Sequence, residues 1–298
     1  MGRQAARLQS LDSLRLITRG SPLKFSNLVY YQAPSINQFG VFSKNESGNP
    51  VAVHMVQEVE ANYAQLLYLI ADGETDQDVV YTLLESVIRA SGEWGVHFLA
   101  GDLLSDSPLL PIFRRLDFIL WARQVICRLA LPLPSAAGEM YHWRVWNNQD
   151  IRAMVSVYHS LVPDLFQAVE PLTRKAMLGL VLYDQDHSIL GYADLVYGPH
   201  GIWVQPFLLP QARDPQIVID LVHALPSTFG RPIYFSLRSY QPWLKELFVD
   251  EHFSMGPEKA LLVKYLVVKN LALGTLETFA ERSRVQTGIP FARFEEKR

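Results

Sequence analysis

The chain has 298 residues, enough for two domains that each bury a core of their own. Apolar residues make up 49% and charged residues 19%, and the net charge of −3 gives no electrostatic reason to expect nucleic acid or an anionic membrane surface as a partner. Cys127 is the single cysteine, which excludes an intramolecular disulfide and favours a reducing, cytoplasmic location. No segment approaches the roughly 18 uninterrupted apolar residues of a membrane span, and no signal-peptide core is present near the start.

In chain order, the first interpretable stretch is Leu8–Ile17, which fits either a short helix or a strand. A hairpin is predicted next, because two strand-like runs, 39–43 and 51–56, flank the turn cluster Asn45–Pro50. The rest of this half is predicted as a strand at 65–71, a helix at 78–91, a strand at 96–100, a short helix at 108–116 and a long strand at 119–131.

Residues 131–138 contain two prolines, small residues and a glycine, so they are interpreted as a linker. The predicted domains are 1–133 and 141–270, followed by a charge-rich helical tail at 271–298. The second half is predicted as a strand at 141–146, a helix ending near 161, a short helix at 163–170, a hairpin of 178–183 with 189–197, a strand at 202–209, a helix at 215–229, a strand at 232–236, a helix at 241–253 and a closing strand at 260–269.

The second half states the element order of the first again, at an offset of roughly 135 residues. This offset is far longer than a solenoid repeat, so the repeated unit is a domain. Each half is predicted as strand, helix or two, hairpin, strand, helix, strand, helix, strand. The predicted fold class is therefore α/β, with a mixed sheet flanked by helices in each of two tandem lobes.

Two segments carry a family resemblance. Leu110–Phe118, with the sequence LPIFRRLDF, is similar to the helix ending in Tyr-x-x-x-Gly-Phe of the GNAT superfamily of acetyl-CoA-dependent N-acyltransferases, and Glu246–Phe253 is a fainter version of it. The chain thus resembles a tandem GNAT protein, divergent in both lobes, over residues 36–133 and 141–269. The resemblance implies acetyl-CoA as the cofactor and an amine, on a small molecule or a peptide, as the acceptor.

The resemblance places the acetyl-CoA pyrophosphate at a helix N-terminus, where N–H groups and the helix dipole favour an anion. The corresponding first-half loop, 72–78, carries four carboxylates that repel a pyrophosphate, so no CoA binding is predicted there. In the second half the resemblance implies that Gln211 and Arg213 hold the phosphates. It also implies that the strand backbone at Gln205 and Phe207 contacts the pantetheine arm.

The usual general acid of the family is a tyrosine five residues before the phenylalanine of the motif. Phe113 and Phe248 stand at these positions, so Tyr240 is the predicted acid. The glycine of the motif is replaced by Asp117 in one copy and His252 in the other. Two hypotheses stay open: an N-acetyltransferase with its site in the second half, or a catalytically inactive GNAT-like protein that binds a protein partner or a second copy of itself.

No histidine pair has metal-ligand spacing, so no metal is predicted. His54 and His97 lie in apolar runs and are predicted as core residues. Cys127 also lies in an apolar strand and is predicted to be buried and inert.

Overall fold

The computed structural model describes residues 7–23, 33, 35–46, 48–58, 61–71, 77–130, 141–170, 178–226, 228–248 and 252–266. Met1–Val267 forms one compact unit, and the second unit, Val268–Arg298, lies outside the described residues. The predicted tail at 271–298, the predicted linker at 131–138 and most of the acidic loop at 72–78 also lie outside them. Across the described part, no helix is long and apolar enough to cross a membrane.

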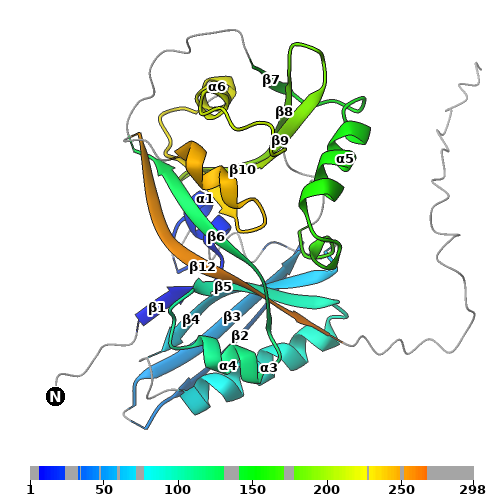
Figure 1. The fold of residues 1–298 in the computed structure, drawn as a ribbon. Helices are drawn as coiled ribbons and strands as arrows, with labels where there is room; N and C mark the ends of the chain where they lie inside the picture. The colour runs from blue at the N-terminus through cyan, green and yellow to red at the C-terminus, as the bar shows by residue number, and fades with distance from the viewer. Residues whose placement is uncertain are drawn as a thin grey trace, which may run out of the picture. The chain divides into compact units, whose positions relative to one another are not determined.

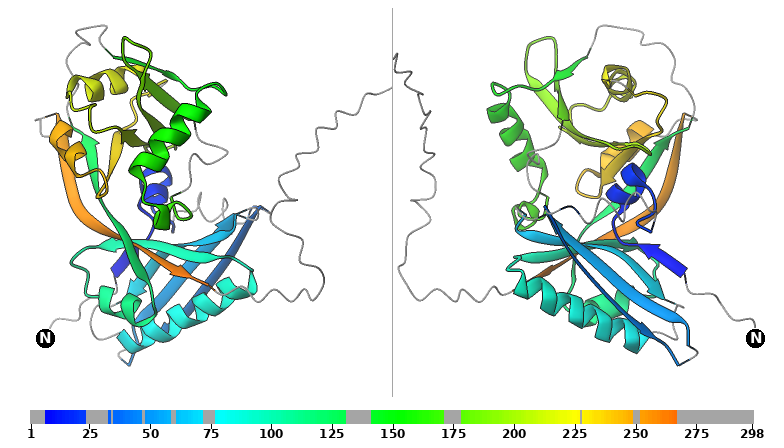
Figure 2. Two further views of the ribbon diagram at one scale, coloured as in Figure 1. Left: turned by 45° about the vertical axis from the view of Figure 1, so that its right-hand side comes forward. Right: turned by 180° about the vertical axis from the view of Figure 1, so that it is seen from behind.

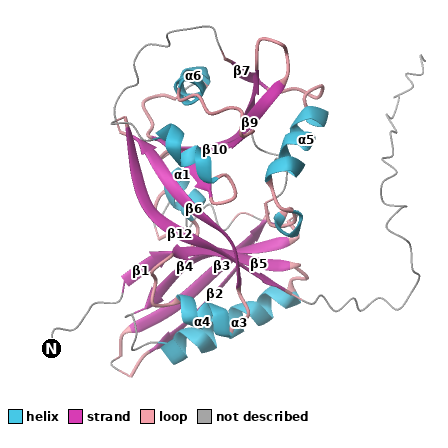
Figure 3. Ribbon diagram, viewed as in Figure 1, coloured by secondary structure: helices cyan, strands magenta, loops and turns pink. Residues whose placement is uncertain are grey.

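Helices and strands follow one another in the same order in the two halves, which confirms the predicted repeat (Figure 1; Figure 3). The first half contains β1 (Arg7–Ser10), α1 (Ser13–Arg19), β2 (Ile36–Lys44), β3 (Pro50–Glu58), β4 (Tyr63–Ala71), α3 (Gln77–Glu93), β5 (Phe98–Leu104), α4 (Leu110–Arg115) and β6 (Ile119–Leu129). The second half contains β7 (His142–Val145), α5 (Ile151–Leu161), η2 (Asp164–Phe166), β8 (Leu178–Tyr183), β9 (Ile189–Tyr197), β10 (Ile202–Leu208), α6 (Gln216–Ala224), β11 (Ile233–Arg238), η3 (Pro242–Phe248) and β12 (Phe253–Tyr265).

Three predicted helices differ from those observed. The short helix predicted at 163–170 is the 3₁₀ helix η2, Asp164–Phe166. The helix predicted at 215–229 ends at Ala224, because Leu225 is extended and precedes Pro226, whose ring disfavours helical backbone before it. The helix predicted at 241–253 is the 3₁₀ helix η3, and β12 begins at Phe253.

The twelve strands of the described residues form one mixed sheet, in the order β2-β3-β4-β5-β12-β6-β11-β10-β9-β8-β7, with β1 paired to β4. The predicted α/β fold with a mixed sheet is therefore confirmed, and the sheets of the two halves are continuous with each other. The last strands of the halves are exchanged. β12 pairs with β5 of the first half, β6 pairs with β11 of the second half, and β6 and β12 pair antiparallel between them.

The hydrophobic cores reflect this exchange. The first-half core, under α3 and α4, includes Ala260 and Leu262 from β12, and the second-half core includes Cys127 from β6. Figure 2 shows α3, in cyan, against the strands of the first half in both views. Cys127 is buried as predicted, and this burial raises the pKa of its thiol to about 12. Of the two histidines predicted in the core, His54 is half-buried, whereas His97 is exposed because it precedes β5 in the connecting turn.

Candidate functional site

In the first half, the parallel strands β4 and β5 pair only at their start, through residues 63–65 with 98–100. Farther along, β3 still occupies one edge of β4, and β1 pairs antiparallel with residues 68–71. A strand has two hydrogen-bonding edges, so β1 must use the edge that β5 has left. β1 therefore enters the split that opens between β4 and β5.

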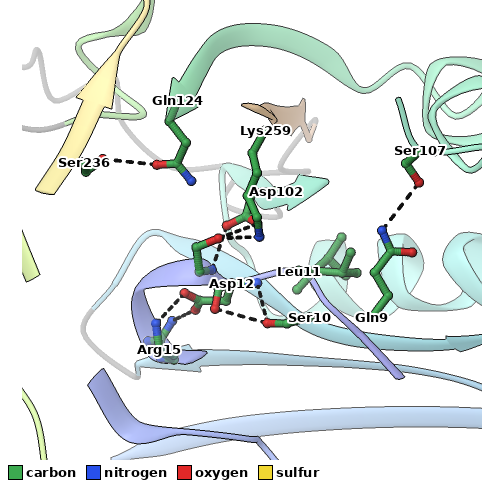
Figure 4. Close-up of polar contacts among 12 residues, drawn as sticks. Gln9, Ser10, Leu11, Asp12, Arg15, Asp102, Ser107, Gln124, Ser236 and Lys259 are labelled. Carbon is green, nitrogen blue, oxygen red and sulfur yellow. Dashed lines mark hydrogen bonds and ion pairs between the residues drawn. The ribbon is translucent and has the colours of Figure 1, made fainter. Parts of the chain in front are cut away.

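Leu11 continues β1 deeper into this split (Figure 4). Its N–H donates to the carbonyl of Leu67 at 2.9 Å, and its own carbonyl accepts from the N–H of Asp102 at 2.9 Å. The side-chain amide of Gln65 donates to the same carbonyl at 3.2 Å. The Leu11 side chain is fully buried in the first-half core. The chain's own backbone thus satisfies groups of both strands that border the split.

A buried charge cluster holds the next residues in place. The Asp102 carboxylate accepts from the Ser13 N–H at 2.7 Å and from the Ser13 hydroxyl at 2.8 Å. Lys259, from β12, lies 2.8 Å from Asp102 and donates to the Ser13 hydroxyl at 2.6 Å. Asp12 caps α1 by accepting from the N–H of Arg15 at 2.9 Å and pairs with its guanidinium at 2.7 Å.

The second half contains the equivalent split, closed by a side chain instead of a strand. β10 and β11 pair in parallel only through residues 202–204 and 233–235. Beyond them, the buried amide of Gln241 donates to the carbonyl of Pro206 at 3.1 Å and accepts from the N–H of Leu208 at 2.9 Å. One primary amide therefore occupies the backbone donor and acceptor that β10 presents to the split.

The backbone of the two predicted pantetheine contacts faces the other way. The N–H of Leu209 donates to the carbonyl of Leu190 in β9, and backbone groups alternate in direction along a strand. Gln205 and Phe207 therefore direct their backbone groups towards β9, and Pro206 and Leu208 direct theirs into the split. The Phe207 ring is buried and stacks on Tyr192, with 4.6 Å between ring centroids.

The side chains of Gln205 and Tyr240, both predicted site residues, meet at a buried ion pair. Glu170 accepts from Arg238 through two nitrogens, Nε at 2.8 Å and Nη2 at 2.9 Å. It also accepts from the Gln205 amide at 2.6 Å and from the Tyr240 hydroxyl at 3.0 Å. The second terminal nitrogen of Arg238 donates to Gln124 and, at 3.0 Å, to Ser236. The group Glu170, Arg238, Gln205, Tyr240, Gln124 and Ser236 is called the Glu170 cluster.

Burial alone would raise the pKa of Glu170, but the charge of Arg238 and the hydrogen bonds from Arg238, Gln205 and Tyr240 outweigh burial and lower the pKa. Burial and the adjacent Glu170 charge raise the pKa of Tyr240 well above its ordinary value. Tyr240 therefore keeps its proton and directs it at Glu170. The sequence analysis did not identify Glu170 or Arg238 as site residues. The signal that could have indicated a buried polar cluster was the presence of the polar residues Gln124 and Arg238 in otherwise apolar strands.

The predicted phosphate-binding loop is exposed and its helix is already capped. Gln211 and Arg213 are exposed, and the Arg213 guanidinium lies 5.8 Å from the centroid of the Trp243 ring. The Asp214 carboxylate accepts from the N–H of Gln216 at 2.9 Å. The N–H groups of residues 217, 218 and 219 in α6 donate to the backbone carbonyls of residues 214 and 215. A carboxylate thus occupies the place where a pyrophosphate would bind.

The phenylalanines of the two motif copies are core residues. Phe113 and Phe248 are buried, and neither carries an acidic proton. Asp117, at the position of the glycine in the resembled motif, has φ of 58°, in the left-handed region that glycine favours. The segment therefore acts as a packing and turn element in the first half. Both splits are closed, α6 is capped, and neither phenylalanine can donate a proton, so the residues present do not fit acetyl-CoA.

A cavity of about 110 Å³ lies where the two halves meet. Asp12 and Arg15 line it from the N-terminal segment, and Glu170 and Arg238 line it from the second half. Trp121 and Trp203 also border it. Within the described part of the chain, no group of three or more His, Cys, Asp or Glu side chains is arranged to hold a metal ion.

Comparisons with known proteins find similarity at the level of fold. No family model matches the chain, and no curated protein matches it. Similar solved structures include a GCN5-related N-acetyltransferase from Sphaerobacter thermophilus, 12% identical over 80% of this chain and 84% of that chain, with a TM-score of 0.49. Another from Kribbella flavida is 11% identical over 80% and 93% of the two chains, with a TM-score of 0.46. A tandem GNAT protein from the clavulanic acid biosynthesis pathway is 11% identical over 83% and 90%, with a TM-score of 0.44. Such identities bear on fold alone.

Proposed function

We propose that this protein acts by binding a protein partner and does not transfer an acetyl group. The observation that carries the proposal is that both splits between parallel strands are occupied by groups of the chain itself. Leu11 fills the first split and Gln241 fills the second, and each makes the backbone hydrogen bonds that an amide-bearing ligand would need. A cofactor arm would have to displace buried groups whose hydrogen bonds are already made.

The competing candidate is an N-acetyltransferase of unidentified amine, with its site in the second half. Its support is that Gln205 and Tyr240, both predicted site residues, meet at Glu170 beside the cavity. A general acid must be free to give its proton to the leaving group. The proton of Tyr240 instead forms a hydrogen bond to a carboxylate, which favours the binding role.

Thermal unfolding with and without acetyl-CoA separates the two candidates. At a ligand concentration of about 100 times Kd, a single site adds about 2.7 kcal/mol to the free energy of unfolding. We expect no shift at millimolar acetyl-CoA, and no heat of binding by titration calorimetry. A saturable shift that Arg213→Glu weakens and Asp78→Lys leaves unchanged would instead support a cofactor site at α6.

The same acetyl-CoA titration of Gln241→Ala tests whether the Asp214 carboxylate at α6 is enough to exclude acetyl-CoA. This change removes the amide from the second split but leaves the Asp214 cap of α6 in place. We expect Gln241→Ala to remain without acetyl-CoA binding, because the pyrophosphate position is still occupied by a carboxylate.

A further inference from the structure

The N-terminal segment Arg7–Gly20, here called the strap, contacts both halves. Its strand β1 and Leu11 lie in the first split, and its helix α1 packs against β10 of the second half. At the end of α1, the carbonyl of Thr18 accepts from the N–H of His200 at 3.0 Å. The approach is so close that a Cβ on Gly198 would lie 2.0 Å from the same carbonyl oxygen. The strap therefore depends on a glycine of the second half.

The internal repeat shows that β1 is displaced from the position its counterpart takes. In the second half, the first strand, β7, pairs with β8, the outer strand of the hairpin. The equivalent partner of β1 would be β2, but β1 pairs with β4 and β2 ends the strand order on its side of the described sheet. The position that β1 occupies is thus one that the fold leaves open, and the edge of β2 offers it a second position.

The strap is held by few fully buried apolar side chains. Within the strap, Leu11 is the fully buried apolar side chain, while Leu8 and Leu16 are 40% and 38% exposed. The other anchors are polar. β1 pairs with β4, Leu11 makes backbone hydrogen bonds, and Ser13 contacts Asp102 and Lys259. Arg15 pairs with Glu58 at 3.1 Å, and the Thr18 carbonyl accepts from His200 at 3.0 Å. Segments with few buried apolar contacts open at low free energy.

The groups that receive the strap select for an extended chain more than for a particular sequence. Leu67 and Asp102 offer a backbone carbonyl and a backbone N–H, which pair with any extended peptide. Specificity comes from the apolar site filled by Leu11 and from the Asp102 carboxylate, which accepts both the N–H and the hydroxyl of Ser13. The carboxylate at this place accepts from hydrogen-bond donors of a ligand, and Lys259, 2.8 Å away, neutralises its charge.

We propose that the strap is releasable and that the first split is a binding site for an extended peptide of a partner protein. The peptide would carry an apolar residue in the Leu11 site and a serine or threonine two residues later, at Asp102. This inference rests on the proposed binding function and names its site and its class of partner. Binding would proceed by strand addition to β4, with the strap as the competing intramolecular ligand.

A labelled peptide with the sequence of residues 7–19 tests the proposal by fluorescence anisotropy on full-length proteins. Leu11→Ala and Gly198→Ala each weaken the strap, one inside the split and one at α1. We expect both variants to bind the peptide at least about tenfold more tightly than the wild type does. Leu84→Ala, which removes an equally buried leucine from α3, and Gly92→Ala, whose added Cβ meets nothing within 4 Å, are the matched controls and should behave like the wild type.

Three outcomes overturn the inference: no binding to either strap variant, equal binding to the controls, or equal binding of a peptide with aspartate at the Leu11 position. Hydrogen exchange of the unmodified protein gives an independent measurement if a variant fails to fold. The Leu11 and Ser13 amide hydrogens should exchange faster than those of β4. If these two amides exchange only through global unfolding of the protein, the inference is also overturned. Displacement of the peptide by acetyl-CoA would refute the proposed function, whereas absence of both peptide and acetyl-CoA binding would refute this inference alone.

Discussion

The Glu170–Arg238 pair provides a direct test of the view that the cluster around it is structural. The charge centres of such a two-nitrogen pair lie about 4 Å apart, so their attraction at an effective dielectric of about 20 is roughly 4 kcal/mol. Both side chains are only 10% exposed, so removing one leaves the other charge buried. We expect Glu170→Gln and Arg238→Met each to lower the free energy of unfolding by about 3–5 kcal/mol. The double variant buries no charge and should lose at least about 2 kcal/mol less than the sum of the two single variants.

Urea unfolding of the four proteins at pH 7 measures this coupling. The exposed pair of Arg123 and Glu258, 2.6 Å apart with side chains 49% and 35% exposed, is the control and should couple by at most about 1 kcal/mol. Because the folded pKa of Glu170 is lowered, its contribution is present above the unfolded value of about 4.3 and is lost as the pH falls towards the folded pKa. Additive single variants, or a cost below about 1 kcal/mol for Glu170→Gln, would refute the structural interpretation.

Two further predictions concern single side chains. Burial lowers the pKa of His54 to about 4 from an ordinary value of 6.5. Between these values the unfolded chain binds more protons than the folded chain, so the free energy of unfolding should fall as the pH drops through this window. Denaturant midpoints at pH 7 and pH 4.5 measure this fall, and His54→Gln should flatten the pH dependence. Replacing Gln241 with leucine leaves the Pro206 carbonyl and the Leu208 N–H buried without their partner, which should lower the free energy of unfolding by about 2–5 kcal/mol. Gln211 is exposed, so Gln211→Leu is the control and should change the free energy of unfolding by less than about 0.5 kcal/mol in the same urea experiment.

The order of elements could be predicted from the sequence because apolar periodicity is local. The hairpins, β4, α3 and β10 follow the predicted ranges closely for this reason. The N-terminal stretch Leu8–Ile17 fitted both a strand and a helix, and it contains both, the end of β1 and the start of α1. Each is shorter than the window over which periodicity can be judged.

The exchange of last strands could not be predicted, because pairing is not a local property. β5 and β11 occupy equivalent positions in the repeat and present equivalent edges, so local pattern does not decide which of them β12 will join. The Glu170 cluster was hidden for a related reason. Its members come from β6, β10, β11 and two connecting turns, and only the fold brings Glu170 within hydrogen-bonding distance of Arg238.

Strand exchange makes a prediction about the two halves as separate molecules. Residues 260–263 of β12 pair with β5, and Leu261, Leu262 and Val263 are 6%, 1% and 1% exposed. At about 1.5–3 kcal/mol for each buried side chain, a first half without β12 would lose about 5–9 kcal/mol, which is comparable to the whole stability of a domain. Fragments 1–133 and 141–298 should therefore fail to fold separately but copurify as a folded complex when coexpressed. Circular dichroism with thermal unfolding measures this, and cooperative unfolding of either fragment alone would favour the independent domains predicted from the sequence.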